Sequence, residues 1–379
     1  MKILLVTNYL PPKIGGIERV SHELAASLNR MQGVEVIVAS NTWPEKYVEK
    51  RDHILEFPYQ IVYFPSYTLF KRLPIPKIFS IIFWRQLRGL DRNFDLVFLQ
   101  SHLFILNWII GFKCRKVDRR IWMNHGCNFV PINNHLVRSI SLVYERIGMA
   151  ISKGISNEFL GQSENAAKWI TTKVGVKFAI LSNAINLELF TEDKVTDNQK
   201  FKTKVLFVGR LVEGKGLLEC ISIVKKANLI LTDLGDSDLF RLTIIGSGRL
   251  ADKIPTSQES LEIVYMGELE QPAVIRAMYE SDILIQAYSQ PEGLTTVTLE
   301  GIATGMFVVT TFLSGDVGIN ECTNYFAGEV SELPHLLLKS RQRSESRTEL
   351  IASGRRFIEA GLTWDVIAKK LITREYSNF

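Results

Sequence analysis

The sequence has few cysteines and little that resembles a membrane span. Its four cysteines lie far apart and show no metal-binding spacing, so we expect reduced thiols, as is usual in a cytosolic protein (Cys114, Cys127, Cys220 and Cys322). The longest apolar run, residues 103–111, is about half of the roughly 18 residues that a spanning helix needs. The apolar run after Met1 is too short for a signal peptide, and Asn8 and Pro11-Pro12 interrupt it. We therefore expect no disulfide framework, no transmembrane helix and no signal peptide.

Several chemical signatures are also missing. The sequence contains no Ser/His/Asp set, no metal-ligand cluster and no aromatic platform for stacking bases. Gly246-Ser247-Gly248 falls short of a dinucleotide fingerprint, so NAD is not inferred. The basic residues form no compact run with a nucleic-acid motif, so we expect no nucleic-acid partner.

The composition indicates a large globular protein with an uneven charge. The chain has 379 residues, of which 46% are hydrophobic and 22% charged, which predicts about two domains and a large core. Residues 1–183 hold 24 Lys+Arg against 13 Asp+Glu, whereas the remainder holds 21 against 27. The first half is therefore strongly basic, which favours an anionic partner such as a membrane or a phosphate-bearing acceptor.

The two halves of the chain begin alike, each with an apolar strand, a glycine-containing loop and a helix. The strands are predicted at 2–7 and 204–209, and the helices at 18–28 and 217–227. Further strand-like runs alternate with helical stretches, at 34–39, 61–64, 95–100, 120–124, 159–163, 178–182, 242–246, 261–266, 283–287 and 307–311. This order predicts two doubly wound, Rossmann-like α/β domains that face each other across a deep cleft. We expect them at 1–185 and 201–360, with a linker at 192–200 and a C-terminal helical segment, 361–379, that crosses back to the first domain.

Two carboxylates stand out in the segment 289–305. Glu292 lies in a Pro/Gly turn, and Glu300 lies about two turns into the threonine-rich helix that follows. A helix start suits a phosphate, and carboxylates accept hydrogen bonds from the hydroxyls of a ribose or a sugar. The alternative is a surface turn followed by a solvated helix face.

Two cations flank the first loop of the second half. Arg210 follows Gly209 at the end of a strand, and Lys215 precedes a helix, so together they can neutralise a diphosphate. They can equally be ordinary surface cations.

Other candidates lie at the ends of predicted strands. Gly246 and Gly248 would let a nucleotide base approach the backbone, or form a plain tight turn. Gly15 and Gly16 would admit a phosphate or acceptor to a helix start, or form a flexible turn. His125 can hydrogen-bond a sugar hydroxyl or stabilise charge near a reacting carbon, although a structural histidine is the commoner case.

Taken in order, these segments resemble the family 4 glycosyltransferases, which retain anomeric configuration and have the GT-B fold. The resemblance covers nearly the whole chain and rests on Gly15-Gly16, Asn124-His125-Gly126, 182–186, 208–216, Gly246-Ser247-Gly248, 267–269 and 291–305. It implies that Arg210 and Lys215 hold the donor diphosphate, Glu300 binds the ribose and Glu292 contacts the donor sugar. It also implies that amides near Leu294, Thr295 and Thr296 support the phosphate and sugar, and that His125 lies near the reacting carbon. The family often has Phe-Gly where this chain has Leu294-Thr295, so donor choice is expected to depend on this loop.

The resemblance implies a metal-independent hexosyl- or N-acetylhexosaminyltransferase with no cofactor. A UDP- or GDP-sugar would be the donor substrate, and a saccharide or polyprenyl-diphosphate-linked saccharide the acceptor, in surface polysaccharide assembly. The alternatives are a sugar-nucleotide epimerase of the same architecture and a non-catalytic subunit that binds nucleotide sugars.

The stretch Tyr63 to Leu90 interleaves aromatic and aliphatic residues with lysine and arginine. This composition suits the interface of an anionic membrane, with a short helix at 78–87, but it also suits a domain core with a basic rim. We therefore expect a cytoplasmic protein, either free or peripheral on the inner face of the cell membrane.

Overall fold

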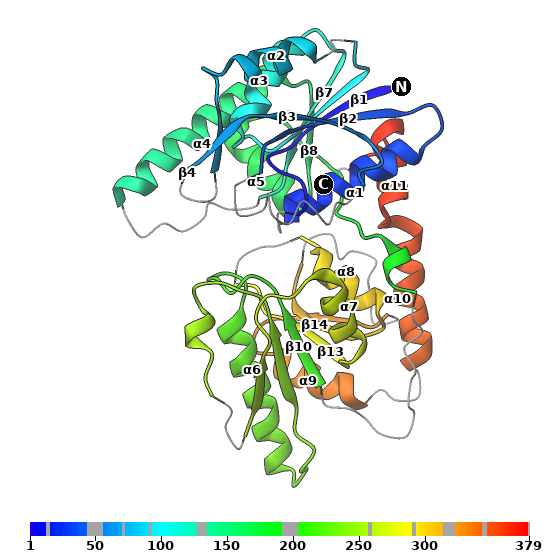
Figure 1. Ribbon diagram of the computed structural model, residues 1–379. Coiled ribbons are helices and arrows are strands. Elements are labelled where there is room, and N and C mark those ends of the chain that lie inside the picture. Colours follow the sequence, from blue (N-terminus) through cyan, green and yellow to red (C-terminus); the bar gives the residue numbers. More distant parts are fainter. Residues whose placement is uncertain are drawn as a thin grey trace. The chain divides into compact units, whose positions relative to one another are not determined.

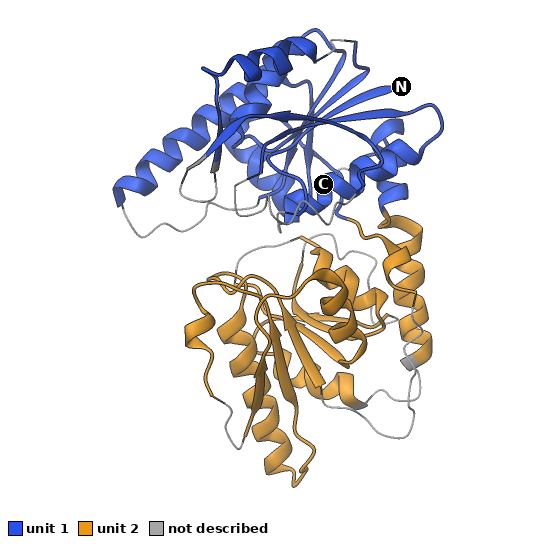
Figure 2. Ribbon diagram, in the orientation of Figure 1, with its two compact units in different colours: residues 1–183, 364–379 blue, residues 184–363 orange. Residues whose placement is uncertain are grey.

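The computed structural model describes residues 1–12, 16–43, 56–69, 73–90, 93–126, 135–191, 204–256, 260–289, 293–313, 323–342 and 347–377. The chain forms two compact units (Figure 2). Unit 1 comprises Met1–Asn183 together with Trp364–Phe379, and unit 2 comprises Ala184–Thr363.

Unit 1 contains a parallel sheet of seven strands in the order β3-β2-β1-β6-β7-β8-β9. Its strands are β1 (Lys2–Val6), β2 (Glu35–Asn41), β3 (Gln60–Phe64), β6 (Leu96–Gln100), β7 (Arg119–Asn124), β8 (Glu158–Gly161) and β9 (Ala179–Ile180). The central strands β1 and β6 are almost entirely buried because helices cover both of their faces. This burial explains their nearly continuous apolar sequences.

Helices pack on both faces of this sheet (Figure 1). The helices are α1 (Gly16–Arg30), α2 (Ile81–Gly89), α3 (Ile105–Lys113), α4 (His135–Ile155), α5 (Glu164–Val174) and α11 (Trp364–Thr373). Phe83 of α2 and Ile110 of α3 enter one core together with Leu4 and Val6 of β1. Helices α1 and α11 contact each other, so the end of the chain is part of unit 1. A small antiparallel hairpin, β4 (Ser66–Leu69) and β5 (Leu73–Pro76), precedes α2.

Unit 2 repeats the plan with six parallel strands in the order β12-β11-β10-β13-β14-β15. Its strands are β10 (Lys204–Val208), β11 (Arg241–Ile245), β12 (Glu262–Tyr265), β13 (Ile283–Gln286), β14 (Phe307–Thr311) and β15 (Tyr325–Gly328). Its helices are α6 (Leu217–Asp233), α7 (Gln271–Tyr279), α8 (Thr296–Ala303), α9 (Leu333–Gln342) and α10 (Arg347–Gly361), with short 3₁₀ turns η3 (Leu187–Leu189) and η4 (Ala251–Lys253). Alternate side chains of β10, such as Phe207 and Leu206, enter separate cores on its two faces.

The predicted fold class is confirmed, and the predicted strands match observed ones. The β4–β5 hairpin and β15 were not predicted. The C-terminal helix ends at Thr373, because Arg374 adopts a left-handed conformation with φ of 61°. The expected linker, 192–200, lies outside the described residues.

A buried ion pair fastens the end of the chain to unit 1. The guanidinium of Arg119 donates to both carboxylate oxygens of Glu158, at 2.8 and 3.0 Å. It also donates to the carbonyl oxygens of Leu371 and Ile372, at 3.0 and 3.3 Å, and lies 3.0 Å from the hydroxyl of Tyr376. Burial opposes the charge on Glu158, but the hydrogen bonds and charge of Arg119 outweigh it and hold its pKa below the usual value.

We expect Arg119→Met to destabilise unit 1 by about 1–3 kcal/mol, because the Glu158 carboxylate loses its bidentate partner and keeps the more exposed Arg374, 3.3 Å away. The double variant Arg119→Met/Glu158→Gln should recover much of this loss, since no buried charge is then left uncompensated. Urea unfolding measures both. Arg241→Ala, which breaks the exposed 3.2 Å pair with Glu262, is the control and should cost less than about 1 kcal/mol. Equal losses in the single and double variants would contradict this account of Arg119.

Candidate functional site

In each sheet the strand order reverses at one point, between β1 and β6 in unit 1 and between β10 and β13 in unit 2. Crevices at the carboxyl ends of the strands beside such a reversal are the usual ligand sites of open α/β sheets. Gly16 begins α1, which follows β1, and His125 directly follows β7, the neighbour of β6. Arg210 and Lys215 lie between β10 and α6, and α8 follows β13. The predicted residues that the structure describes therefore gather at one edge of each sheet. Gly15 and Glu292 lie outside the described residues.

In unit 2, a chain of contacts joins the loop after β10 to the start of α8. The ammonium of Lys215 lies 5.3 Å from the centre of the Tyr288 ring. The hydroxyl of Tyr288 is 3.1 Å from Oγ1 of Thr295. Oγ1 of Thr295 in turn accepts a hydrogen bond from the amide of Thr298 and caps α8. The cation and the positive end of a helix dipole are thereby held at the same sheet edge, which favours an anion.

Glu300 lies in the second turn of α8, and its side chain is buried. A carboxylate in a buried position needs hydrogen-bond donors or cations to keep its charge. Leu294 is buried beside the helix start, whereas Thr295 and Thr296 are partly exposed. The threonines thus present their polar groups where α8 begins.

Three glycines of unit 2 lie where the backbone leaves no room for a side chain. Gly246 has a φ of 139°, and a Cβ at this position would lie 1.9 Å from the carbonyl oxygen of Gly209. A Cβ on Gly216 would lie 1.8 Å from the carbonyl oxygen of Ala287. Close packing of backbone on backbone therefore accounts for these glycines, and Gly248 packs on Leu211 in the same way. The predicted approach of a nucleotide base to Gly246 and Gly248 stays a prediction.

In unit 1, two glutamines that the sequence analysis did not single out hold His125. Nδ1 of His125 lies 3.0 Å from Oε1 of Gln162, and its Nε2 contacts Oε1 of Gln100. Burial lowers the pKa of His125 to about 4. Gln100 ends β6 and Gln162 directly follows β8, so the strands on either side of β7 supply these contacts. The signal in the sequence was weak: each glutamine is a polar residue at the end of a predicted strand.

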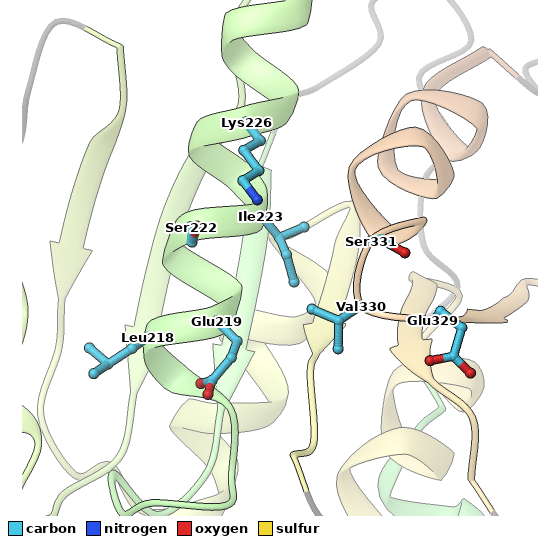
Figure 3. Close-up of a pocket in the computed structure, with 8 residues that line it drawn as sticks. All are labelled: Leu218, Glu219, Ser222, Ile223, Lys226, Glu329, Val330 and Ser331. Carbon is cyan, nitrogen blue, oxygen red and sulfur yellow. The ribbon is translucent and has the colours of Figure 1, made fainter.

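The part of unit 2 that the structure describes also contains an open groove of about 670 Å³ beside α6 (Figure 3). Ile223 of α6 and Val330 point towards each other across it, with Lys226 and Glu329 at its ends. None of the predicted site residues lines this groove, so it is not part of the candidate site.

Two features are absent from the described residues. No group of three or more His, Cys, Asp or Glu side chains in the described ranges is placed to hold a metal ion. Among the helices that the structure describes, none is both long and apolar enough to cross a membrane.

Two family models match successive parts of the chain. The model described as Glycosyltransferase Family 4 matches residues 14–189, and the model described as Glycosyl transferases group 1 matches residues 202–333. The two matches fall largely within units 1 and 2, respectively.

Relatives and a solved structure agree with these models. An uncharacterised glycosyltransferase of Methanocaldococcus jannaschii is 25% identical over 98% of this chain and 97% of its own length. A GDP-mannose-dependent monoacylated alpha-(1-6)-phosphatidylinositol monomannoside mannosyltransferase of Corynebacterium glutamicum is 22% identical over 98% and 96%. The crystal structure of Anabaena HepE in complex with UDP and glucose matches in fold with a TM-score of 0.70, at 13% identity and 99% coverage of both chains.

The resemblance inferred from the sequence is therefore confirmed. The two family models together span most of the chain, and the two parallel sheets have the architecture of a GT-B enzyme. The chain belongs to the family 4 glycosyltransferases and has the GT-B fold.

Proposed function

We propose that the chain is a retaining hexosyl- or N-acetylhexosaminyltransferase that uses a UDP- or GDP-sugar. The acceptor is a saccharide or a polyprenyl-diphosphate-linked saccharide in surface polysaccharide assembly. The observation that carries the proposal is the link from Lys215 through Tyr288 to Thr295, because it holds a cation beside a capped helix start. That combination suits the diphosphate of a nucleotide sugar.

In this mechanism the chain's main contribution is electrostatic. The donor diphosphate gains negative charge as the bond to the sugar breaks. Arg210, Lys215 and the amides at the start of α8 would stabilise that charge without a resident metal ion or a cofactor. Glu300 would accept hydrogen bonds from the ribose hydroxyls, and Glu292 would contact the sugar. Retention would follow from attack on the same face that the diphosphate leaves, with a diphosphate oxygen taking the proton of the acceptor hydroxyl.

We expect Lys215→Ala and Arg210→Ala each to lower kcat/KM by about 10²–10³, the loss typical of removing one preorganised charge-stabilising group. The assay is nucleotide release from a panel that includes UDP-glucose and GDP-mannose. Lys226→Ala and Arg241→Ala are matched controls, since both residues are exposed cations of unit 2. A fully active Arg210→Ala variant would remove this residue from the proposed site.

The nucleotide can be identified by thermal denaturation with UDP, GDP and ADP. The solved HepE structure contains UDP, whereas the Corynebacterium relative is GDP-mannose-dependent, so both bases are candidates. A nucleotide present at 100 times its Kd should stabilise the native protein by about 2.7 kcal/mol. Glu300→Gln should bind the same nucleotide more weakly and show a smaller shift, because the amide accepts fewer ribose hydrogen bonds. Glu329→Gln, in the groove beside α6, should shift as the wild type does. Equal shifts in all three proteins would exclude Glu300 from ribose binding.

We also propose that unit 1 contacts an anionic membrane. Helix α2 is divided: Phe83 and Leu87 are buried, whereas Ile81, Ile82 and Trp84 are exposed and the adjacent Phe79 is 99% exposed. The core interpretation of Tyr63 to Leu90 fits the buried side chains, and the exposed side chains leave room for the interface interpretation, which stays a proposal. Arg85 and Arg88 are exposed on the same helix, which suits anionic lipid.

Helix α4 supports this proposal with a second apolar face. Leu136, Ile140, Val143 and Ile147 are all at least half exposed and follow one another at helical spacing. Arg138 and Arg146 are exposed on the same helix. Helix α3 contacts α4 and the β4–β5 hairpin that precedes α2, and α2, α3 and α4 lie on the same side of unit 1 (Figure 1). The lipid-linked substrate named for the Corynebacterium relative is in keeping with such a surface.

We expect the protein to float with vesicles that contain phosphatidylglycerol and not with neutral phosphatidylcholine vesicles, and the binding should weaken as salt rises. Ile81→Ser/Trp84→Ser should remove most of the binding, and Arg85→Ser/Arg88→Ser should reduce it. Leu234→Ser is the control, because Leu234 is a 75% exposed leucine of unit 2. The proposal fails if the wild type does not float, or if the α2 variants float equally well.

A further inference from the structure

The hydrogen-bond partners of His125 bear on whether its imidazole ring carries one proton or two. Its Nδ1 faces Oε1 of Gln162 at 3.0 Å, and its Nε2 faces Oε1 of Gln100. A neutral imidazole has one N–H and can donate to only one of these oxygens. Either the ring carries two protons, or one glutamine presents its amide NH₂ group instead.

A doubly protonated ring is disfavoured by its environment. A small cavity in unit 1 is lined by His125, both glutamines and nine further residues, and none of these other residues has an ionisable side chain. Among the described residues that line this cavity, there is therefore no carboxylate to stabilise an imidazolium. Burial acts in the same direction and lowers the pKa of His125 to about 4. The ring is thus neutral at physiological pH.

Gln100 is the glutamine best placed to donate. It is fully buried, and its Nε2 has no hydrogen-bond partner among the described residues while its Oε1 faces the ring. Turning the amide by 180° hardly changes its shape, but it brings Nε2 to the lone pair on Nε2 of His125. The atom then left unpaired is a carbonyl oxygen, which proteins tolerate better in their interior than an unpaired N–H. Nδ1 of His125 then carries the proton and donates it to Gln162.

The backbone makes this arrangement rigid. The amide of Ser101, next to Gln100, donates to the carbonyl oxygen of Met123 in β7. The amide of Gln162 donates to the carbonyl oxygen of Asn124, the residue before His125. Both glutamines are therefore tied by main-chain hydrogen bonds to the strand that ends at the histidine.

We propose that Gln100 and Gln162 are positioning residues that hold His125 as a neutral imidazole protonated on Nδ1. If the proposed transfer reaction is correct, His125 contributes to it as a fixed dipole and neither takes nor gives a proton. The acceptor proton then goes to the departing diphosphate. The state of the ring itself does not depend on that reaction.

The direct test is NMR of the whole protein with ¹⁵N-labelled histidine. The sequence has six histidines, and the signals that disappear in His125→Gln identify the pair from His125. We expect a protonated Nδ1, an unprotonated Nε2 and no titration between pH 8 and pH 5. A proton on Nε2, or a titration midpoint within that range, would overturn the proposal.

Substitution of the glutamines should shift the titration midpoint of His125 in a predictable direction. In Gln100→Glu the new carboxylate accepts but does not donate, so Nε2 must be protonated and the midpoint of His125 should rise by about one to three pH units. Gln162→Glu should raise it in the same direction if Gln100→Glu does not fold. Gln100→Met fills a similar volume without a donor and should leave the proton on Nδ1. Unchanged midpoints in both folded Glu variants would show that the glutamines do not face the ring, which excludes the proposal.

Measurements of stability and kinetics can distinguish a role of the glutamines in positioning His125 from a role in packing alone. Because the folded pKa of His125 lies below its unfolded value, the folded state binds fewer protons, and the stabilising contribution is complete above about pH 6.5 and is lost as pH falls towards 4. The Tm advantage of wild type over His125→Gln should shrink between pH 7.5 and pH 5. Burial also lowers the pKa of His22, but its effect on stability cancels because both proteins contain it. Kinetics give a separate test in the transfer assay. Gln100→Glu should lower kcat more than it raises KM for the donor. Its kcat should also depend on pH, whereas that of Gln100→Met should not. If no transfer is found, the NMR result still decides the state of the ring, so failure of the proposed function is distinguishable.

Discussion

Parallel strand pairing is the constraint on which both units depend. In a parallel sheet all strands end at the same edge, and the chain must return along a helix before the next strand begins. The loops that leave β1, β6 and β7 therefore meet in unit 1, and those that leave β10 and β13 meet in unit 2. Side chains that are far apart in the sequence are thereby brought together, as Lys215 and Tyr288 are.

Much of the fold could be predicted because parallel strands buried on both faces read as short apolar runs. Leu96–Gln100 and Phe307–Thr311 are clear examples, and each is fully buried. The hairpin of β4 and β5 was missed because Pro74 and Pro76 interrupt its second strand, where prolines are tolerated only at an edge. β15 was missed because Tyr325–Gly328 is short and ends in Ala-Gly, which has low strand propensity. Such elements depend on tertiary contacts that local sequence does not encode.

Residues of the candidate site could be singled out when a charged side chain lies near the end of a predicted strand. The side chains that contact them could not be predicted when they come from a different strand. Arg210, Lys215 and Glu300 could be singled out because cations and carboxylates near glycines suggest a diphosphate and a ribose. Gly246 is less certain, because close packing on the backbone of Gly209 is enough to require a glycine there, whether or not a ligand also approaches it. Gln100 and Gln162 could not be paired with His125 from sequence, since only the order of β6, β7 and β8 in the sheet brings the three together.

The two units differ in where their positively charged side chains lie, and this difference affects the proposed reaction. Unit 2 is mildly acidic overall but has Arg210 and Lys215 at the edge where α8 begins, so its positive charge is local. Unit 1 is basic, yet the described residues that line the cavity beside His125 include no other ionisable side chain. Cations such as Arg85, Arg88, Arg138 and Arg146 are instead exposed on helices α2 and α4. An excess of charge on exposed side chains can attract an anionic surface or substrate from a distance, as the proposed membrane contact requires. In the proposed reaction, a neutral imidazole at His125 would add no positive charge to repel a cationic centre that develops on the sugar. The proposed catalysis, by fixed cations on the diphosphate and a fixed dipole near the sugar, would then require no protein group to change its protonation state.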